Sequence, residues 1–540
     1  MKLKQVAKKI LGYSNTKITR GDEDPKKYSK ALKDLIEYYP ELEDKKLIIT
    51  KENKDNPFDP MVKKIVDGYD LVNFEIDKYG DDNVKEYPSA PLSSGDAIKY
   101  KPFPDCTKKI IATALSNNLN IYPSTIGSQR ARQDLVDYLK REGFPNKKNE
   151  YCDEINVHNV AFCASTTQAF SMIIKVIARP GDVIIIPAPT YGIFATIAEK
   201  EGVHQEVIKL RKENDYFVSP EELREKIDSI NKKLKEKGSK KYGYIPKVAA
   251  YLNINPHNPI GNVMTHDNLD IITKIGDICL EKGVFIIDDL IYRDLTYNQN
   301  KLAYPIASIP KYFNTTISLF GVSKSYGLAS IRAGFIVMPT PVFWGFATGI
   351  FDLMDSMGVL QVEAVRGAFN GTDKRYKHNK EYFDKLIPIY LYQLDLVNAL
   401  IYGIDSIKNP YNKKKIINDI KEYSKEEKVQ KQILQGIENI SISEKTYPQS
   451  GFFIIADFTK LKGKYYKGNK IETEYDLLKA MYNFGKVRYL MGENFMWPNE
   501  DEFVARINFA IDKKALIHNF YQINRLVKEL KDEAPKKNNI

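Results

Sequence analysis

The sequence predicts an α/β protein built around a mostly parallel β-sheet with helices on both faces. Short apolar runs recur between residues 160 and 338, and each has the length of a buried strand. Segments with helical periodicity lie between several of these runs, as crossover connections require. Strands made of continuous apolar residues are buried on both faces, which is typical of parallel sheets.

The composition indicates a large globular protein and excludes several classes. A chain of 540 residues suffices for two or three domains, and its 43% hydrophobic and 28% charged content is ordinary for soluble proteins. The net charge of +11 comes from lysines that are mixed with glutamates along the chain, so we expect no nucleic-acid partner. No run approaches the roughly 18 apolar residues of a membrane helix, so we expect no membrane partner.

The cysteines show neither a CxxC pair nor a histidine at metal-ligand spacing. They are Cys106, Cys152, Cys163 and Cys279. We therefore expect reduced thiols rather than disulfides or a metal site, and a cytoplasmic location.

Residues 1–98 are expected to form a polar, helical extension that ends in a linker. Asp24-Pro25 and Asp59-Pro60 each pair an N-cap residue with proline at the first helical position. Residues 87–96 are rich in Pro, Ser and Gly, which is typical of a linker. We expect no chemistry in this part of the chain.

The elements of the predicted sheet follow. Helices are expected near residues 110–114 and at 131–139, and crossover helices at 169–177 and 269–281. The expected strands are 160–163, 183–186, 248–252, 284–287, 317–320 and 335–338. Ligands of such sheets bind at the carboxyl ends of the strands, so the residues after each run are candidate site residues.

The turn between the last two strands carries one lysine and one arginine. A lysine at the end of a buried strand loses solvation and can react as a neutral amine, as Schiff-base chemistry with an aldehyde requires. Lys324 has this position, and Arg332 offers a planar, permanently charged group that suits a phosphate. The pair fits pyridoxal 5′-phosphate, and the alternative is a solvated lysine in an ordinary loop.

Three other strand ends carry polar or aromatic residues. Ser165 and Thr166 begin the helix after strand 160–163, where unpaired N–H groups bind anions, although a plain N-cap is the alternative. Tyr191 can stack on a flat ring, or simply pack. Asn258 can hydrogen-bond a phenolic oxygen, or simply belong to a loop.

The strand at 284–287 is followed by Asp289 and Tyr292. A buried carboxylate is costly unless it meets a cation, and a protonated pyridine nitrogen would be that cation. The two residues are three apart, so on a helical turn both can face one ring.

Together these segments resemble the class I/II aminotransferases, a family of fold-type-I pyridoxal-phosphate enzymes. The most specific matches are Ser-Lys-(seven residues)-Arg-Ala-Gly at 323–334, Asn-Pro-His-Asn-Pro-Ile-Gly at 255–261 and Asp-Leu-Ile-Tyr at 289–292. The resemblance implies a large cofactor-binding domain at 99–365 and a smaller α+β domain at 366–540. A helical insert at about 373–446 is longer than the family usually has there.

The resemblance also implies residue roles. Lys324 is similar to the lysine that forms the aldimine, Asp289 to the partner of the pyridine nitrogen, and Arg506 to the arginine that binds the substrate α-carboxylate. The other implied cofactor ligands are Ser165, Thr166, Tyr191, Asn258, Tyr292, Ser323 and Arg332, with Tyr191 counted as catalytic too. Tyr122 is similar to a tyrosine that reaches the phosphate from the neighbouring subunit, which implies a homodimer.

Two positions depart from the family pattern. Gly321 stands where many members have a serine on the phosphate, and Ile260 replaces the usual threonine of the Asn-Pro-Thr-Gly corner. No arginine is obviously placed to bind a second substrate carboxylate. Arg366 is a candidate by its position alone.

The resemblance implies transamination between an L-amino acid and a 2-oxo acid. A lyase or decarboxylase such as an aspartate 4-decarboxylase is the alternative, because such enzymes share the fold and cofactor. A non-catalytic pyridoxal-phosphate-binding regulator is less favoured, because residues 1–95 show no convincing helix-turn-helix and Arg506 favours catalysis.

Overall fold

The computed structural model describes residues 92–95, 97, 100–116, 119–237 and 242–533. The chain divides into two compact units, Met1–Pro91 and Leu92–Ile540, and the structure described below is that of the second. The helices expected after Asp24 and Asp59 lie outside the described residues.

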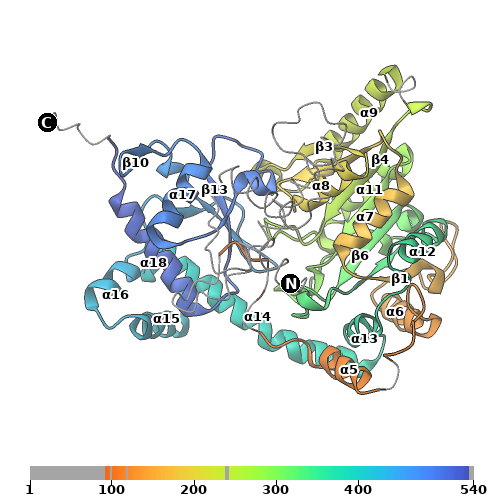
Figure 1. Ribbon diagram of the computed structural model, residues 1–540, viewed down its shortest axis with the longest axis horizontal. Helices are drawn as coiled ribbons and strands as arrows, with labels where there is room; N and C mark the ends of the chain where they lie inside the picture. Colours follow the sequence, from red (N-terminus) through yellow and green to blue (C-terminus); the bar gives the residue numbers. More distant parts are fainter. Residues whose placement is uncertain (1–91, 96, 98–99, 117–118, 238–241, 534–540) are drawn as a thin grey trace, which may run out of the picture. The chain divides into compact units, whose positions relative to one another are not determined.

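A seven-stranded sheet forms the centre of this unit (Figure 1). Its strands run in the order β1-β7-β6-β5-β4-β2-β3. Their bounds are β1 Val160–Cys163, β2 Val183–Ala188, β3 His204–Lys209, β4 Val248–Ile254, β5 Phe285–Asp289, β6 Thr316–Gly321 and β7 Gly334–Val337. The strands β3, β2, β4, β5 and β6 are mutually parallel, whereas β7 is antiparallel to both of its neighbours. The prediction of a mostly parallel sheet is confirmed, and all six expected strands are present.

The seventh strand, β3, was not predicted. It lies at the edge of the sheet and pairs only with β2. Its residues alternate between exposed and partly buried positions, and only Ile208 is fully buried. An edge strand of this kind lacks the continuous apolar run that marks the central strands.

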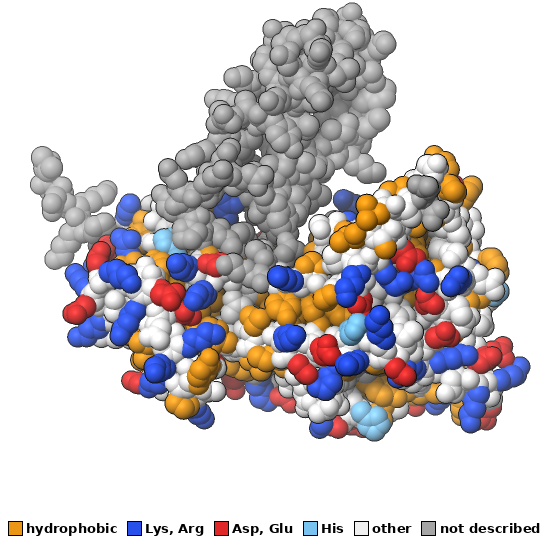
Figure 2. Space-filling model, turned by 90° about the horizontal axis from the view of Figure 1, so that it is seen from below, with side chains coloured by type: hydrophobic (Ala, Val, Ile, Leu, Met, Phe, Trp, Pro, Cys, Tyr) orange, Lys and Arg blue, Asp and Glu red, His pale blue; other side chains and the backbone are white. Residues whose placement is uncertain are grey.

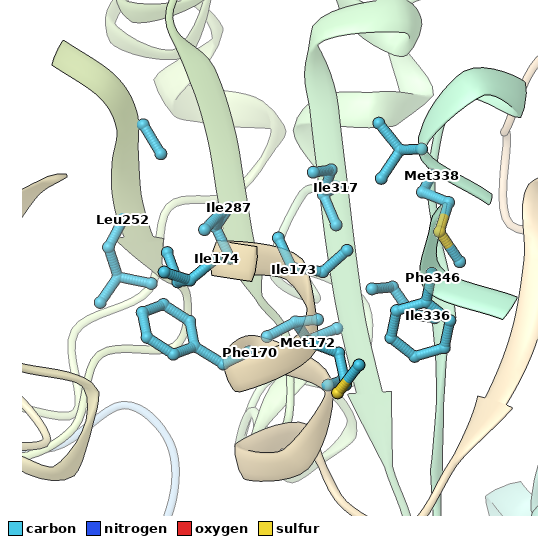
Figure 3. Packing of buried hydrophobic residues seen from close by; sticks show 14 of the residues in the cluster. Phe170, Met172, Ile173, Ile174, Leu252, Ile287, Ile317, Ile336, Met338 and Phe346 are labelled. Carbon is cyan, nitrogen blue, oxygen red and sulfur yellow. The ribbon is translucent and has the colours of Figure 1, made fainter. Parts of the chain in front are cut away.

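Helices cover both faces of the sheet, and each face has its own apolar cluster. On one face α7 (Thr166–Ile177), α8 (Ile193–Lys200) and α12 (Thr340–Met354) pack against it. On the other lie α9 (Pro220–Lys237) and α11 (Leu269–Lys282). Figure 3 shows Ile173 of α7 beside Ile317 of β6, and Phe170 of the same helix on the side of Leu252 of β4. Burial of each such side chain stabilises the fold by roughly 1.5–3 kcal/mol.

Three further helices of the large-sheet part are short. They are α5 (Pro104–Ala114), α6 (Gln129–Arg141) and α13 (Val359–Ala368). The first two match helices that the sequence predicts.

A smaller antiparallel sheet follows, in the order β12-β13-β9-β8. Its strands are β8 Ser441–Ile442, β9 Phe453–Asp457, β12 Leu490–Met491 and β13 Val504–Asn508, and a separate hairpin pairs β10 Tyr465–Tyr466 with β11 Asn469–Lys470. Two helices, α17 (Glu474–Gly485) and α18 (Lys513–Glu529), pack together in this part.

The segment that was predicted as a helical insert is helical. It contains α14 (Asp373–Tyr402), α15 (Pro410–Tyr423) and α16 (Glu427–Leu434). The 30-residue helix α14 runs from α13 beside the large sheet to α18 beside the small one (Figure 1).

Charges on the surface are mixed in sign. Figure 2 shows a face on which blue basic and red acidic side chains alternate, without a concentrated basic patch. All four cysteines are buried and free. In the described part of the chain, no helix has both the length and the apolar character to cross a bilayer.

Candidate active site

The turn after β6 presents Lys324 at the carboxyl end of the large sheet. Lys324 lies three residues beyond Gly321, the last residue of β6, and is half-buried, as is Ser323. Its Nζ donates a hydrogen bond to the Gly95 carbonyl at 2.6 Å. The turn ends at Arg332, which has a left-handed backbone with φ of 55° and is followed by β7.

Asp289 ends the neighbouring strand β5 and is 5% exposed. The pKa of its carboxyl is raised to about 7, chiefly by burial; the adjacent Asp288 acts in the same direction, while the Ile291 N–H and Lys324 act against it. The Asp288 carboxylate accepts hydrogen bonds from the Asn253 amide and the Ile306 N–H, and burial still raises its pKa to about 6. Asp289 is therefore a buried acid beside a lysine, in a position that favours a cationic ligand.

The N-terminus of α7 lies beside the end of β6. A Cβ on Gly321 would come within 3.6 Å of the Thr166 side chain. The Ser165 hydroxyl caps α7 by accepting the Gln168 N–H at 3.1 Å, which is ordinary N-cap geometry, and Thr166 is half-buried. Arg332 is exposed and donates to the Ala329 carbonyl at 3.2 Å.

Three residues around these groups come from other loops. Tyr191 follows β2, is half-buried, and meets Phe194 edge-on at 5.4 Å between ring centroids. Tyr292 is 4% exposed and meets Phe452 edge-on at 5.9 Å. Asn258 follows β4 and is 8% exposed.

Arg506 reaches this site from the small sheet. It lies in β13, between β12 and β9, and is 5% exposed rather than on a surface edge. Its guanidinium lies over the Phe453 ring at 4.2 Å and donates to Asn258 Oδ1 at 3.4 Å. The two sheets therefore contribute adjacent side chains to one site.

Sequence reasoning missed Leu92–Gly95, which it assigned to a linker without chemistry. That interpretation is wrong for these residues, because Leu92, Ser93 and Ser94 are buried. The Ser93 carbonyl accepts from Arg506 Nη2 at 3.1 Å, and Ser94 Oγ accepts from the Asn508 amide at 2.8 Å. A Pro/Ser/Gly-rich composition gives no signal of such contacts, which depend entirely on the distant strand β13.

Two predicted residues lie elsewhere. Tyr122 is 86% exposed in the single chain. Arg366 makes ion pairs with Asp134 at 2.6 Å and with Glu363, so α13 and α6 account for its charge.

The two departures from the family pattern have structural explanations. A Cβ on Gly321 would lie 2.6 Å from the δ-methyl of Ile291, so that methyl fills the space of a side chain. Ile260 is 1% exposed and belongs to the apolar cluster of the α9/α11 face.

Comparisons with known proteins identify the family and the fold. The family model "Aminotransferase class I and II" matches residues 90–377, more than half of the chain. Cystathionine beta-lyase PatB of Bacillus subtilis is 27% identical over 42% of this chain and 53% of its own. Nicotianamine aminotransferase 1 of Oryza sativa is 24% identical over 60% of each chain. The chain thus spans little more than half of these two relatives.

Longer matches have lower identity. A probable aspartate/prephenate aminotransferase of Aquifex aeolicus is 21% identical over 79% of this chain and 88% of its own. The crystal structure of aspartate aminotransferase from Rhizobium meliloti has a TM-score of 0.61 at 16% identity, covering 82% of this chain and 92% of that one, and so shares the fold. The chain belongs to the class I and II aminotransferase family, whose members have fold type I and depend on pyridoxal 5′-phosphate.

Proposed function

We propose that this protein is an aminotransferase that moves an amino group between an L-amino acid and a 2-oxo acid. One observation carries the proposal: Arg506 of the small sheet contacts Asn258 in the loop after β4, and Arg506 and Lys324 donate to carbonyls two residues apart, those of Ser93 and Gly95. A carboxylate-binding fork, a reactive amine and a buried acid are the groups that amino-acid chemistry on a pyridoxal cofactor needs.

The residues present fit that cofactor. Asp289, a buried acid with a raised pKa, suits a protonated ring nitrogen, and this is the test that the structure offers. Lys324 would hold the aldehyde carbon, and Tyr191 would stack on the ring. The remaining proposed contacts are Asn258 and Tyr292 to the ring hydroxyl, and Ser165, Thr166, Ser323 and Arg332 to the phosphate. When bound, the cofactor supplies an electron sink that acidifies the substrate Cα–H bond.

The chain's own groups would then divide the work. Arg506 binds the substrate α-carboxylate through two parallel hydrogen bonds and so fixes the Cα–H direction. Lys324 Nζ, once free of the aldehyde carbon, would accept the proton from Cα and deliver it to that carbon, as amino-group transfer requires. Pairing with a protonated ring nitrogen would stabilise the ionised form of Asp289, which burial disfavours, so the site favours a protonated ring.

The experiment that tests the proposal is borohydride reduction of the holoprotein followed by peptide mapping. We expect the label on Lys324 alone. A panel of amino acids and 2-oxo acids, followed through the visible spectrum, should then show amino-group exchange. A label on another lysine, or no label, would refute the assignment.

A lyase reaction is the second candidate, because two similar proteins are named cystathionine beta-lyase and S-alkyl-thiohydroximate lyase. The two reactions differ in their need for an acceptor. Loss of amino acid that proceeds fully without added 2-oxo acid would identify a lyase or a decarboxylase, whereas transamination stops after one turnover.

We also propose a homodimer with shared sites. Apolar side chains near Tyr122 and on α12 are exposed in the single chain, and such surfaces mark interaction sites. They include Ile111, Leu115, Leu119, Ile121, Trp344, Phe351 and Leu353. Mixing inactive Lys324→Ala with weakened Tyr122→Ala should restore activity, because one site of each mixed dimer is intact. No restoration, or a monomer in sedimentation, would contradict it.

A cytoplasmic location remains part of the proposal and is supported by the four buried free thiols. Cell fractionation tests it directly.

A further inference from the structure

A cluster of charged and phenolic side chains is buried beside the turns that carry Lys324 and Tyr292. Its members are Glu142, Arg293, Asp294, Arg375, Tyr138, Tyr326 and Tyr376. Asp294 is 6% and Arg375 3% exposed. Two carboxylates balance two guanidinium groups, as buried charges require.

The Tyr326 hydroxyl joins the parts of this cluster. It donates to Asp294 Oδ2 at 2.7 Å and accepts from Arg375 Nη2 at 2.8 Å. The ring is fully buried and packs on Phe103 and Phe369, with centroids 5.3 and 5.2 Å away. A hydroxyl that both donates and accepts fixes its partners in direction as well as in distance.

The cluster ties together the two turns of the candidate active site. Tyr326 lies two residues after Lys324, and Asp294 lies two residues after Tyr292. The same turns are joined once more by Ser325 Oγ, which donates to the Ile291 carbonyl at 3.3 Å. A shift of one turn against the other must therefore break a buried hydrogen bond.

Arg375 extends the tie to the long helix α14. It lies in the first turn of α14, where its N–H is capped by Thr372 Oγ1 at 3.3 Å. Farther along the helix, the Gln393 amide donates to the Ile511 carbonyl. Ile511 lies three residues after Asn508, the last residue of the strand β13 that carries Arg506. Helix α14 thus contacts both the turn that carries Lys324 and the segment that follows β13.

We propose that Asp294, Tyr326 and Arg375 are positioning residues. Their hydrogen bonds fix the positions of Lys324 and Tyr292 relative to the cofactor ring, and Arg375 links these positions to helix α14. The inference rests on the proposed function. A stabilising role alone explains the cluster poorly, because buried ion pairs add little net stability compared with apolar side chains of similar volume. Their directional bonds instead specify a single arrangement, and catalysis depends steeply on such placement.

The test compares two variants of the holoprotein that lose the same kind of bond. Tyr326→Phe keeps the buried ring and removes the hydroxyl. Tyr392→Phe is the matched control, because the Tyr392 hydroxyl donates to buried Asp419 at 2.6 Å between α14 and α15. The measurements are the circular dichroism of the bound cofactor, which reports ring orientation, the cofactor Kd, and kcat and KM separately.

We expect Tyr326→Phe to change the cofactor dichroism and to lower kcat about tenfold with KM within about twofold. Tyr392→Phe should leave all of these at wild-type values. If the two variants behave alike, the cluster is only structural and the inference fails. If Tyr326→Phe does not fold, Asp294→Asn, which keeps the side-chain shape, decides by the same measurements.

The outcomes also separate this inference from the proposed function. If the proposed function fails, the wild-type protein itself shows no cofactor bond at Lys324. If only this inference fails, the wild type is active and Tyr326→Phe matches it in dichroism and kcat.

Discussion

Two buried carboxylates of the large-sheet part stand in opposite electrostatic situations. Burial raises the pKa of Asp289 to about 7, and its neighbouring groups compensate only in part. Burial acts in the same direction on Glu142, but Arg293 at 2.6 Å and the Tyr376 hydroxyl outweigh it, so the pKa of Glu142 lies below its ordinary value. Asp289 therefore belongs to a site that favours a cationic ligand. Glu142 belongs to a cluster in which arginines of the protein itself supply the positive charge.

This difference has a physical meaning for the whole molecule. A carboxylate whose ionised form is costly gains free energy from a cationic ligand, so it contributes to binding rather than to folding. A carboxylate that is already paired contributes to the geometry of the folded state. The two kinds of region should therefore respond in opposite ways to mutation.

The largest effect on activity is expected from substitution of Lys324, which lies beside Asp289 in the candidate active site. Lys324→Ala removes both the covalent attachment and the proton carrier, so we expect turnover to fall at least about 10⁴-fold. The free energy of unfolding without cofactor should change little, because the side chain is half-buried. Turnover assays and urea unfolding check both statements. Retention of both activity and the visible band would contradict the assignment.

The variant Glu142→Gln tests whether the paired carboxylate of the cluster contributes to the stability of the folded state. This change removes the nearer of the two carboxylates beside buried Arg293, Glu142 at 2.6 Å, and leaves Asp294 at 3.4 Å. Breaking a buried pair costs about 3–5 kcal/mol of unfolding free energy, so we expect a loss of up to that size. Glu154→Gln is the control, because Glu154 pairs with Lys140 at the surface and should cost at most about 1 kcal/mol. Equal losses in urea unfolding would mean that the cluster is no more strongly coupled than a surface pair.

The pH dependence of stability sharpens the contrast. The folded pKa of Asp289, about 7, exceeds the ordinary value of 3.8, so the folded state binds more protons between these values. The cofactor-free protein should then lose unfolding free energy as the pH rises from about 4 to 7, by a few kcal/mol at most. Asp289→Asn should flatten that slope, as measured by urea unfolding at several pH values. An unchanged slope would show that Asp289 titrates normally.

The smallest expected effect is at Arg506. Arg506→Lys keeps the charge but loses the planar fork, so we expect KM for the amino acid to rise about 10- to 100-fold. The exposed Arg525, which lies on α18, gives the control Arg525→Lys with unchanged KM. A KM that does not respond to Arg506→Lys would remove this residue from the substrate site.

Much of the large sheet could be predicted from sequence because burial leaves a local signature. Strands such as β4 and β6 are buried throughout and mostly apolar, and polar residues follow them closely. Asp289 and Lys324 were predictable for the same reason: each interrupts an apolar pattern at a strand end. The edge strand β3 gave no such signal, since water replaces a partner on one side.

The rest depends on contacts between distant segments. The importance of Ser93 follows from its bond to Arg506, more than four hundred residues away. Likewise, a charged residue in the first turn of a helix, such as Arg375, is typical of a solvated position, and only the packing of α14 buries it. Local patterns carry no information about such partners.

The position of Leu92–Gly95 has a practical consequence for protein engineering. A shortened form beginning at residue 92 keeps the carbonyl oxygens that meet Lys324 and Arg506, whereas one beginning at residue 99 discards them. Trimming from the amino-terminal side should therefore stop before residue 92, seven residues earlier than the domain boundary expected from the sequence, if the contacts of the candidate active site are to be kept.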